Sequence, residues 1–113
     1  MIKENKLLFA GILVFTTFLG AVGQLLFKIG VGSQTPIMLV FYVLLGLISY
    51  AISTLFYLYT LSRTHLSWAY GFGGLSYLFT TILAFLVLNE QVPVLRWVGV
   101  FVIFVGVALI GIS

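Results

Sequence analysis

The sequence predicts an all-α membrane protein with four transmembrane helices, in which neighbouring helices run antiparallel. Two observations support this prediction. The 113 residues are 63% hydrophobic and 6% charged, with a mean hydropathy of +1.31, whereas about a quarter of the residues in a soluble domain are charged. Between Leu7 and Ser113 only four residues carry a formal charge, and they divide the chain into apolar lengths that each suffice to cross a bilayer.

The composition also excludes several classes of function. Four spans and short loops use almost every residue, which leaves no room for an extramembrane catalytic domain, so we expect no enzyme. The chain has no cysteine and one histidine, so we expect neither a metal site nor a cofactor. The net charge of +3 comes from single basic residues near helix ends, where they anchor helices rather than bind nucleic acid.

Four apolar stretches form a single transmembrane domain over residues 1–113. The first follows Lys3 and Lys6 and is too long for the core of a signal peptide, so we expect it to be retained. Pro36 opens the second helix at a favoured first-turn position. Short polar segments at 62–65 and 89–93 allow the remaining chain reversals. The expected helices cover approximately residues 7–30, 36–61, 66–88 and 94–112.

The orientation of the bundle is only weakly encoded. An even number of helices places both termini and the second loop on one side of the membrane. That side carries three basic residues, Lys3, Lys6 and Arg63, and the other side carries two, Lys28 and Arg96. This small difference favours cytoplasmic termini slightly and is also compatible with insertion in both orientations, and so with an antiparallel homodimer. We expect a multi-pass protein of the cell (inner or plasma) membrane.

One face of the first helix is polar. Thr17, Gly20, Gln24 and Lys28 recur at steps of three and four residues, so they share a side of a helix that is otherwise apolar. Lys28 lies near the helix end, where it either snorkels to the interface as an anchor or, with Gln24 one turn deeper, faces an internal site for an anionic group. Lys28, Gln24 and Gly20 are therefore candidate substrate-binding residues.

The third helix is rich in small and hydroxyl residues, which is typical of an interface or a cavity lining. Tyr70 is a further candidate for substrate binding. Gly71, Gly73 and Gly74 permit close contact with another helix and also make a bend inexpensive. They are therefore either packing residues or part of a moving, gating segment.

Two pairs of residues lie on or beside the fourth helix. Gly99 and Gly106 stand seven residues apart on one face, which suits either dimerisation or packing within the same chain. Glu90 and Arg96 flank Pro93 at a membrane boundary. They either form a salt bridge that stabilises the helix start or contribute to gating or substrate handling.

Taken together, these features resemble the drug/metabolite transporter superfamily and its four-helix, small-multidrug-resistance-like members, over nearly the whole chain. The matching pieces are Gly23-Gln24-Leu25-Leu26-Phe27-Lys28, Trp68-Ala69-Tyr70, Asn89-Glu90-Gln91-Val92 and the Gly99/Gly106 pair. The resemblance implies a dimeric bundle of the small-multidrug-resistance type. Proton-coupled cation exporters of that superfamily carry a glutamate in the middle of the first helix where this chain has Gly20, so their mechanism does not carry over.

Residues 23–28 and 89–92 are similar to the paired subunits that flip aminoarabinose-phosphoundecaprenol. This similarity implies a transporter that moves a polyprenyl-phosphate-linked sugar or a similar anionic membrane lipid by alternating access. The working unit would be a homodimer or a heterodimer with a paralogue. In that scheme Lys28 pairs with phosphate, Gln24 and Tyr70 bind the head group, and the glycines of the third helix permit rocking. Gly99 and Gly106 hold the dimer, and Glu90 and Arg96 form a boundary latch.

Two alternatives stay open. The first is an exporter of cations or polyamines, in which Glu90 and aromatic rings replace the missing glutamate of the first helix. The second is a non-transporting membrane subunit whose helices assemble or stabilise a larger complex.

Overall fold

The structure, a computed structural model that describes residues 6–113, consists of helices and short connections, with no strand in that range. Its elements are α1 (Lys6–Val31), α2 (Pro36–Leu61), α3 (Leu66–Gly71), α4 (Gly74–Val87) and α5 (Val94–Ile112). α3 and α4 together form one membrane crossing, so the described chain has four spans that are long and apolar enough to cross a bilayer. The predicted four-span, all-α architecture is confirmed. Lys3, which entered the charge count above, lies outside the described residues.

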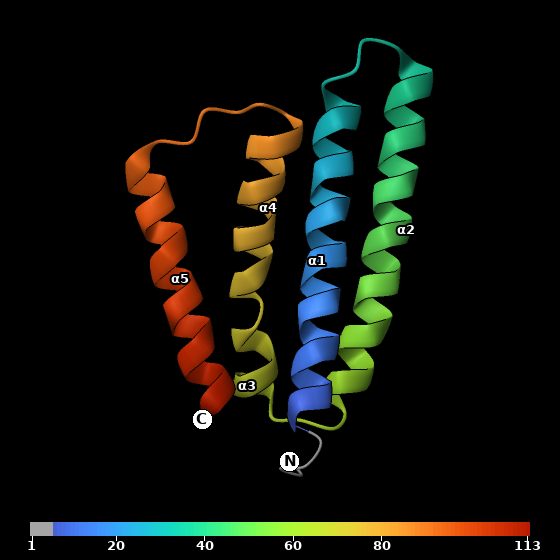
Figure 1. Cartoon of the computed structure of the whole chain (residues 1–113). Coiled ribbons are helices and arrows are strands. Elements are labelled where there is room, and N and C mark those ends of the chain that lie inside the picture. Colours follow the sequence, from blue (N-terminus) through green and yellow to red (C-terminus); the bar gives the residue numbers. More distant parts are fainter. Residues whose placement is uncertain (1–5) are drawn as a thin grey trace.

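The helices stand side by side in the order α2, α1, α4, α5 (Figure 1). The loops after α1, α2 and α4 each reverse the chain direction, so spans that follow one another in the chain are antiparallel, whereas α1 and α4, which lie side by side, run in the same direction. α1 begins at the end of the molecule where α5 finishes. The Cα atoms extend over 49 × 33 × 17 Å. The molecule is therefore a thin slab in which α1 and α4 are the inner helices.

α1 and α2 approach most closely where glycines face each other. A Cβ atom at Gly46 would lie 2.7 Å from the ring of Phe27 and 3.0 Å from the carbonyl oxygen of Gly23. A Cβ atom at Gly23 would lie 3.2 Å from the carbonyl oxygen of Gly46 and 3.0 Å from the ring of Tyr50. Backbone meets backbone here, which only residues without a side chain allow.

Hydrogen bonds join the same two helices. The hydroxyl of Ser49 donates to the carbonyl of Leu19, and the hydroxyl of Ser53 donates to the carbonyl of Thr16, each over 2.8 Å. Helical carbonyls already accept an intrahelical bond, and their second lone pair is free for such a contact. α2 is thus attached to α1 by polar bonds as well as by close packing.

The α4–α5 contact is built from side chains. A Cβ atom at Gly74 would meet the side chains of Ile103 and Val107 at 3.0 Å, and one at Gly71 of α3 would meet Ile110 at 2.7 Å. These two glycines therefore receive aliphatic side chains of α5. Buried residues of α1, α3, α4 and α5 form the hydrophobic core, which comprises Phe9, Leu13, Trp68, Ala69, Phe72, Leu75 and Val107.

The third crossing is interrupted between α3 and α4, whereas the sequence analysis expects one helix over 66–88. Around the break the backbone hydrogen bonds span three residues instead of four. The Phe72 amide donates to the Ala69 carbonyl, Gly73 to Tyr70 and Leu75 to Phe72, over 2.9–3.2 Å. Such a local tightening allows a helix to change direction. A Cβ atom at Gly73 would lie 3.0 Å from the carbonyl oxygen of Tyr70, so the absence of a side chain makes this tight turn inexpensive.

Local sequence explains the other helix ends. Thr35 caps α2, because its hydroxyl oxygen accepts a hydrogen bond from the Met38 amide at 3.4 Å, and Pro36 follows at the first helical position. After α4, Asn89 adopts a left-handed conformation with φ of 55°. Asparagine tolerates this conformation better than most residues, and it turns the chain toward α5.

Candidate functional site

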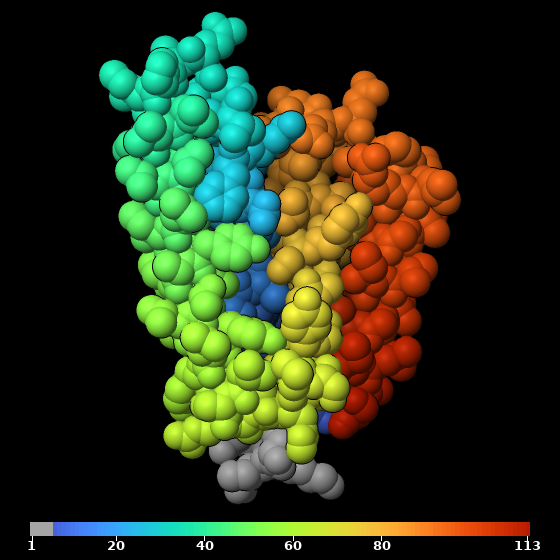
Figure 2. Space-filling view, turned by 180° about the vertical axis from the view of Figure 1, so that it is seen from behind, coloured from blue at the N-terminus to red at the C-terminus, as the bar shows by residue number. Residues whose placement is uncertain are grey.

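A cavity of about 450 Å³ lies between α1, α2 and the α3–α4 segment. Thr17 and Gly20 of α1 form its floor, Ser53 of α2 lines one wall, and Tyr70 and Ser76 of α3 and α4 line the other. Seen from behind, the molecule is hollowed at mid-height between α2 and α4, with α1 at the bottom of the hollow (Figure 2). We call this space the central cavity.

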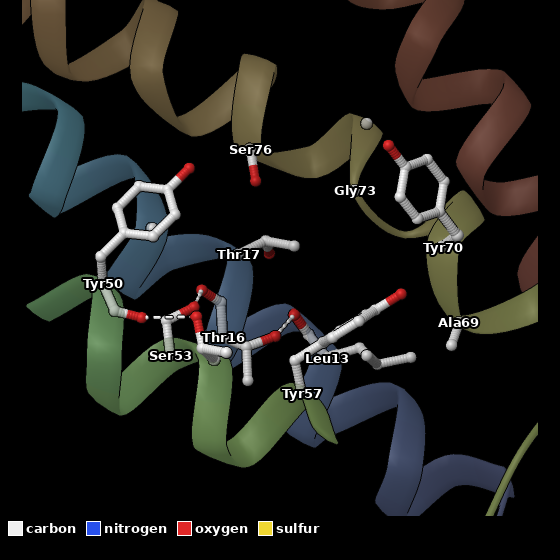
Figure 3. A pocket seen from close by; sticks show the side chains of 13 residues that line it. Leu13, Thr16, Thr17, Tyr50, Ser53, Tyr57, Ala69, Tyr70, Gly73 and Ser76 are labelled. Carbon is white, nitrogen blue, oxygen red and sulfur yellow. Dashed lines mark hydrogen bonds between the residues drawn. The ribbon is translucent and has the colours of Figure 1, made fainter. Parts of the chain in front are cut away.

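Hydroxyl groups give the central cavity its polarity. On α1, Thr16 donates to the Leu13 carbonyl and Thr17 to the Val14 carbonyl, both over 2.8 Å. On α2, the Ser53 hydroxyl reaches the α1 backbone, as described above, and the contact is drawn in Figure 3. None of the residues that line the cavity carries a formal charge. The cavity is therefore polar and neutral.

Three tyrosines border the same cavity. Tyr50 and Tyr57 extend from α2, and Tyr70 stands beside Gly73 on the opposite wall (Figure 3). Tyr70 is 73% exposed, whereas the hydroxyl oxygen of Tyr57 is buried and has no hydrogen-bond partner among the described residues. Rings and hydroxyls together suit a ligand with a polar, hydrogen-bonding head.

Gln24 and Lys28 lie in a second hollow of about 270 Å³, which α1 forms with the end of α4. Leu88 and Glu90 also line it, and we call it the boundary pocket. Gln24 donates from Nε2 to the hydroxyl of Tyr50 over 3.3 Å. Because Tyr50 also lines the central cavity, the two hollows adjoin. Both lie along the α1–α4 contact.

The same helix faces continue from one hollow into the other. On α1, Thr17 and Gly20 line the central cavity, and the next members of the series, Gln24 and Lys28, line the boundary pocket. On α4, Ser76 is followed at helical spacing by Thr80 and Ala84 of the boundary pocket. The polar face predicted for α1 thus faces α4 along its length.

Glu90 and Arg96 both line a third hollow of about 280 Å³, between α4 and the start of α5, with Tyr77 and Thr80 in its wall. Glu90 therefore borders both this hollow and the boundary pocket. Its backbone amide donates to the Ala84 carbonyl over 3.2 Å, which positions it just beyond α4. The arrangement brings Lys28, Glu90 and Arg96 to one end of the molecule. Their gating role stays a prediction.

The structure separates the predicted glycines into three groups. Gly20, Gly73 and Gly74 line the central cavity, and Gly71 packs against α5. Gly99 and Gly106 differ from them, because a Cβ atom at either position would have no atom within 4 Å. Packing within the chain therefore does not explain this last pair. Dimerisation through them stays a prediction.

Neither the α2 side of the site nor Thr16 is predicted from the sequence. Ser53 and Tyr57 belong to a polar stripe on the second helix whose spacing, four residues, places them on one face. That spacing was the available signal, but by itself it is equally typical of helix packing. No sequence pattern marks Thr16 as a site residue. It belongs to the site because its side of α1 meets α2, and only the tertiary arrangement shows this.

Comparison with known protein families gives one finding. The profile of the EamA-like transporter family matches residues 5–112, which is almost the whole chain. Comparisons with curated proteins and with solved structures find no match.

Proposed function

We propose that this chain, which belongs to the EamA-like transporter family, translocates an anionic lipid, such as a polyprenyl-phosphate-linked sugar, by alternating access. Membership makes it a transporter of the drug/metabolite transporter superfamily, and its four apolar spans make it an integral, multi-pass membrane protein. The lipid substrate and the working dimer are our proposal.

One observation supports the lipid most strongly: a neutral, hydroxyl-lined cavity adjoins a pocket that holds a lysine and an amide. A sugar needs hydrogen-bonding groups and aromatic faces, which Tyr70 and the cavity hydroxyls supply. A phosphate needs a cation, which Lys28 supplies, and Gln24 offers an amide beside it. An amphipathic molecule with a sugar and a phosphate would use both hollows at once.

The distances suit such a molecule. Gly20 and Lys28 are eight residues apart, which corresponds to about 12 Å along α1. Side chains of a helix leave the backbone tilted toward its N-terminus, so the Lys28 stem sets out toward Gln24 and the cavity. The ammonium group can therefore approach a phosphate attached to a sugar in the cavity.

The apolar tail would remain in the bilayer. The molecule is only 17 Å thick in its shortest dimension, and the cavity opens on the face shown in Figure 2. A second copy or a paralogue would complete the polar path, with the open glycines Gly99 and Gly106 as contact points. The interruption at Gly73 would provide the bend that alternating access requires.

Translocation of undecaprenyl-phosphate-linked glucose in proteoliposomes tests the proposal. Lys28→Ala and Gln24→Ala should each slow the exposure of the sugar to an external lectin, Lys28→Ala by about tenfold or more, because a charge-assisted contact with phosphate is lost. Arg63→Ala is the matched control, because it removes an exposed basic side chain at the opposite end of the molecule. If both variants fold, insert and translocate as the parent does, the lipid proposal fails.

A second candidate is export of an organic cation or polyamine, which the tyrosines around the neutral cavity favour through cation–π contacts. Tetraphenylphosphonium and spermidine are suitable probes. Proton release on adding either to weakly buffered, detergent-solubilised protein would favour export, and its absence would favour the lipid.

A non-transporting subunit is the third alternative. The purified chain, reconstituted alone or with one similar chain, should translocate lipid if it is a transporter. Strict dependence on an unrelated catalytic protein would favour the subunit instead.

A further inference from the structure

On the α1–α2 side of the central cavity the threonine and serine hydroxyls already use their protons, whereas Tyr50 accepts a hydrogen bond from Gln24 and Tyr57 has no partner among the described residues. Thr17 donates to the Val14 carbonyl over 2.8 Å, and on α2 Thr54 donates to the Tyr50 carbonyl over 2.9 Å. Ser53 donates across the helix contact to Thr16. A hydroxyl has one proton and two lone pairs. What these three groups have left to offer a ligand is therefore their lone pairs.

Redirecting these protons toward a ligand would be costly. In a membrane no water replaces the lost partner, so each freed hydroxyl must exchange one hydrogen bond for another. For Ser53 the bond at stake also joins α2 to α1. Thr17, Ser53 and Thr54 are thus held as a group of acceptors.

The opposite wall has no such restriction. Ser76 and Tyr70 line it, and the described residues provide no hydrogen-bond partner for either side chain. Each of these hydroxyls is free to rotate, and each can donate or accept. The cavity therefore combines three hydroxyls that are held as acceptors, Thr17, Ser53 and Thr54, with hydroxyls that can also donate.

We infer that Thr17, Ser53 and Thr54 form an acceptor side of the central cavity, so that a bound head group turns its O–H or N–H groups toward these three hydroxyls. Ether oxygens and anionic oxygens, which only accept, are disfavoured there. This inference rests on the proposed function, because it takes the cavity as the head-group site. It adds a selection rule: the head group must carry donors, and its anionic part stays outside the acceptor side.

Two detergents with the same tail test this rule. Octyl β-glucoside carries four hydroxyl donors, and its tetra-O-methyl ether carries none. Binding of each to the protein, measured by native mass spectrometry below the critical micelle concentration, should differ by about tenfold or more in favour of the glucoside, because the ether leaves several acceptors unpaired.

A variant separates this effect from the extra bulk of the methyl groups. Thr17→Val keeps the side-chain shape and removes the acceptor, so the preference for the glucoside should shrink to about threefold or less. Thr81→Val is the matched control, because Thr81 is equally buried and donates to the Tyr77 carbonyl over 2.8 Å but lies outside the central cavity. The control should keep the full preference.

Equal binding of the two detergents to the parent protein would overturn the inference. An unchanged preference in Thr17→Val would do the same, and Thr54→Val provides a second reading if Thr17→Val does not insert. These probes carry no phosphate, and the measurement involves no translocation. If the parent prefers the glucoside but Lys28→Ala translocates lipid normally, the proposed substrate is rejected and the selection rule stands. If the two detergents bind equally but Lys28→Ala translocates lipid slowly, only the selection rule is rejected.

Discussion

The two halves of the slab are held together differently. α1 and α2 meet backbone to backbone at Gly23 and Gly46, and serine hydroxyls of α2 bind α1 carbonyls. α4 and α5 meet through side chains at Gly74, and Gly99 and Gly106 of α5 face open space. The comparison indicates a rigid α1–α2 unit beside a more adaptable half that contains the interrupted crossing. This combination suits the alternating access that we propose.

The largest expected effect follows from filling the α1–α2 contact. Gly46→Val places a branched side chain where even a Cβ atom would lie 2.7 Å from Phe27 and 3.0 Å from a backbone oxygen. We expect the free energy of unfolding in mixed micelles to fall by about 3 kcal/mol. Gly99→Val, with no atom near its Cβ, is the control and should stay within about 0.5 kcal/mol of the parent. Equal losses in the two variants would contradict the comparison.

Removing the polar bonds between the same helices should have an intermediate effect. The double substitution of Ser49→Ala and Ser53→Ala deletes two hydroxyl–carbonyl contacts, and we expect a loss of about 1–2 kcal/mol in unfolding free energy. Thr54→Ala removes a hydroxyl that bonds only within its own helix and should cost less. A double variant as stable as the parent would show that packing alone joins α1 to α2.

Adding a side chain at the α4–α5 contact should lower the free energy of unfolding less than either change at the α1–α2 contact. In Gly74→Ala the new methyl meets aliphatic side chains of α5 at 3.0 Å, and these can shift by a few tenths of an ångström. Alanine also favours the helix over glycine by about 0.8–1 kcal/mol, so the net change in unfolding free energy should be about zero. A loss as large as that of Gly46→Val would mean that this half is equally rigid.

The smallest effect on the single chain is expected at the open glycines, where the change should appear in association instead. The double variant of Gly99→Val and Gly106→Val should unfold like the parent in dilute detergent. Energy transfer between labelled chains in vesicles should fall, because bulky side chains separate helices that glycines allow to touch. Unchanged energy transfer would place the dimer contact elsewhere.

Much of the fold could be predicted from the sequence, because in a membrane the positions of charges and prolines limit where helices end. Four spans, each antiparallel to the next one along the chain, follow from the positions of Lys28, Arg63, Glu90 and the two prolines. The exact break at Phe72–Gly73 does not, since three nearby glycines permit a bend without locating it.

The candidate site could be predicted from the sequence only in part. Periodicity places Thr17, Gly20, Gln24 and Lys28 on one face of α1, and the structure turns that face toward α4. Periodicity does not say which helix a face meets, so the four-residue spacing of Ser53 and Tyr57 on α2 is equally typical of helix packing. Of the three hydroxyls on which the donor selection depends, Thr17 and Thr54 bond within their own helices, whereas the bond of Ser53 arises only when α2 is placed beside the α1 backbone.

Native mass spectrometry of the protein purified with its own lipids tests the central claim most directly, that the adjoining hollows hold an anionic lipid with a polar head. The account predicts that the parent and Arg63→Ala retain an adduct with the mass of a sugar-bearing polyprenyl phosphate, and that Lys28→Gln loses most of it. Retention of the same adduct by Lys28→Gln, or of zwitterionic phospholipid alone by every form of the protein, would contradict the account.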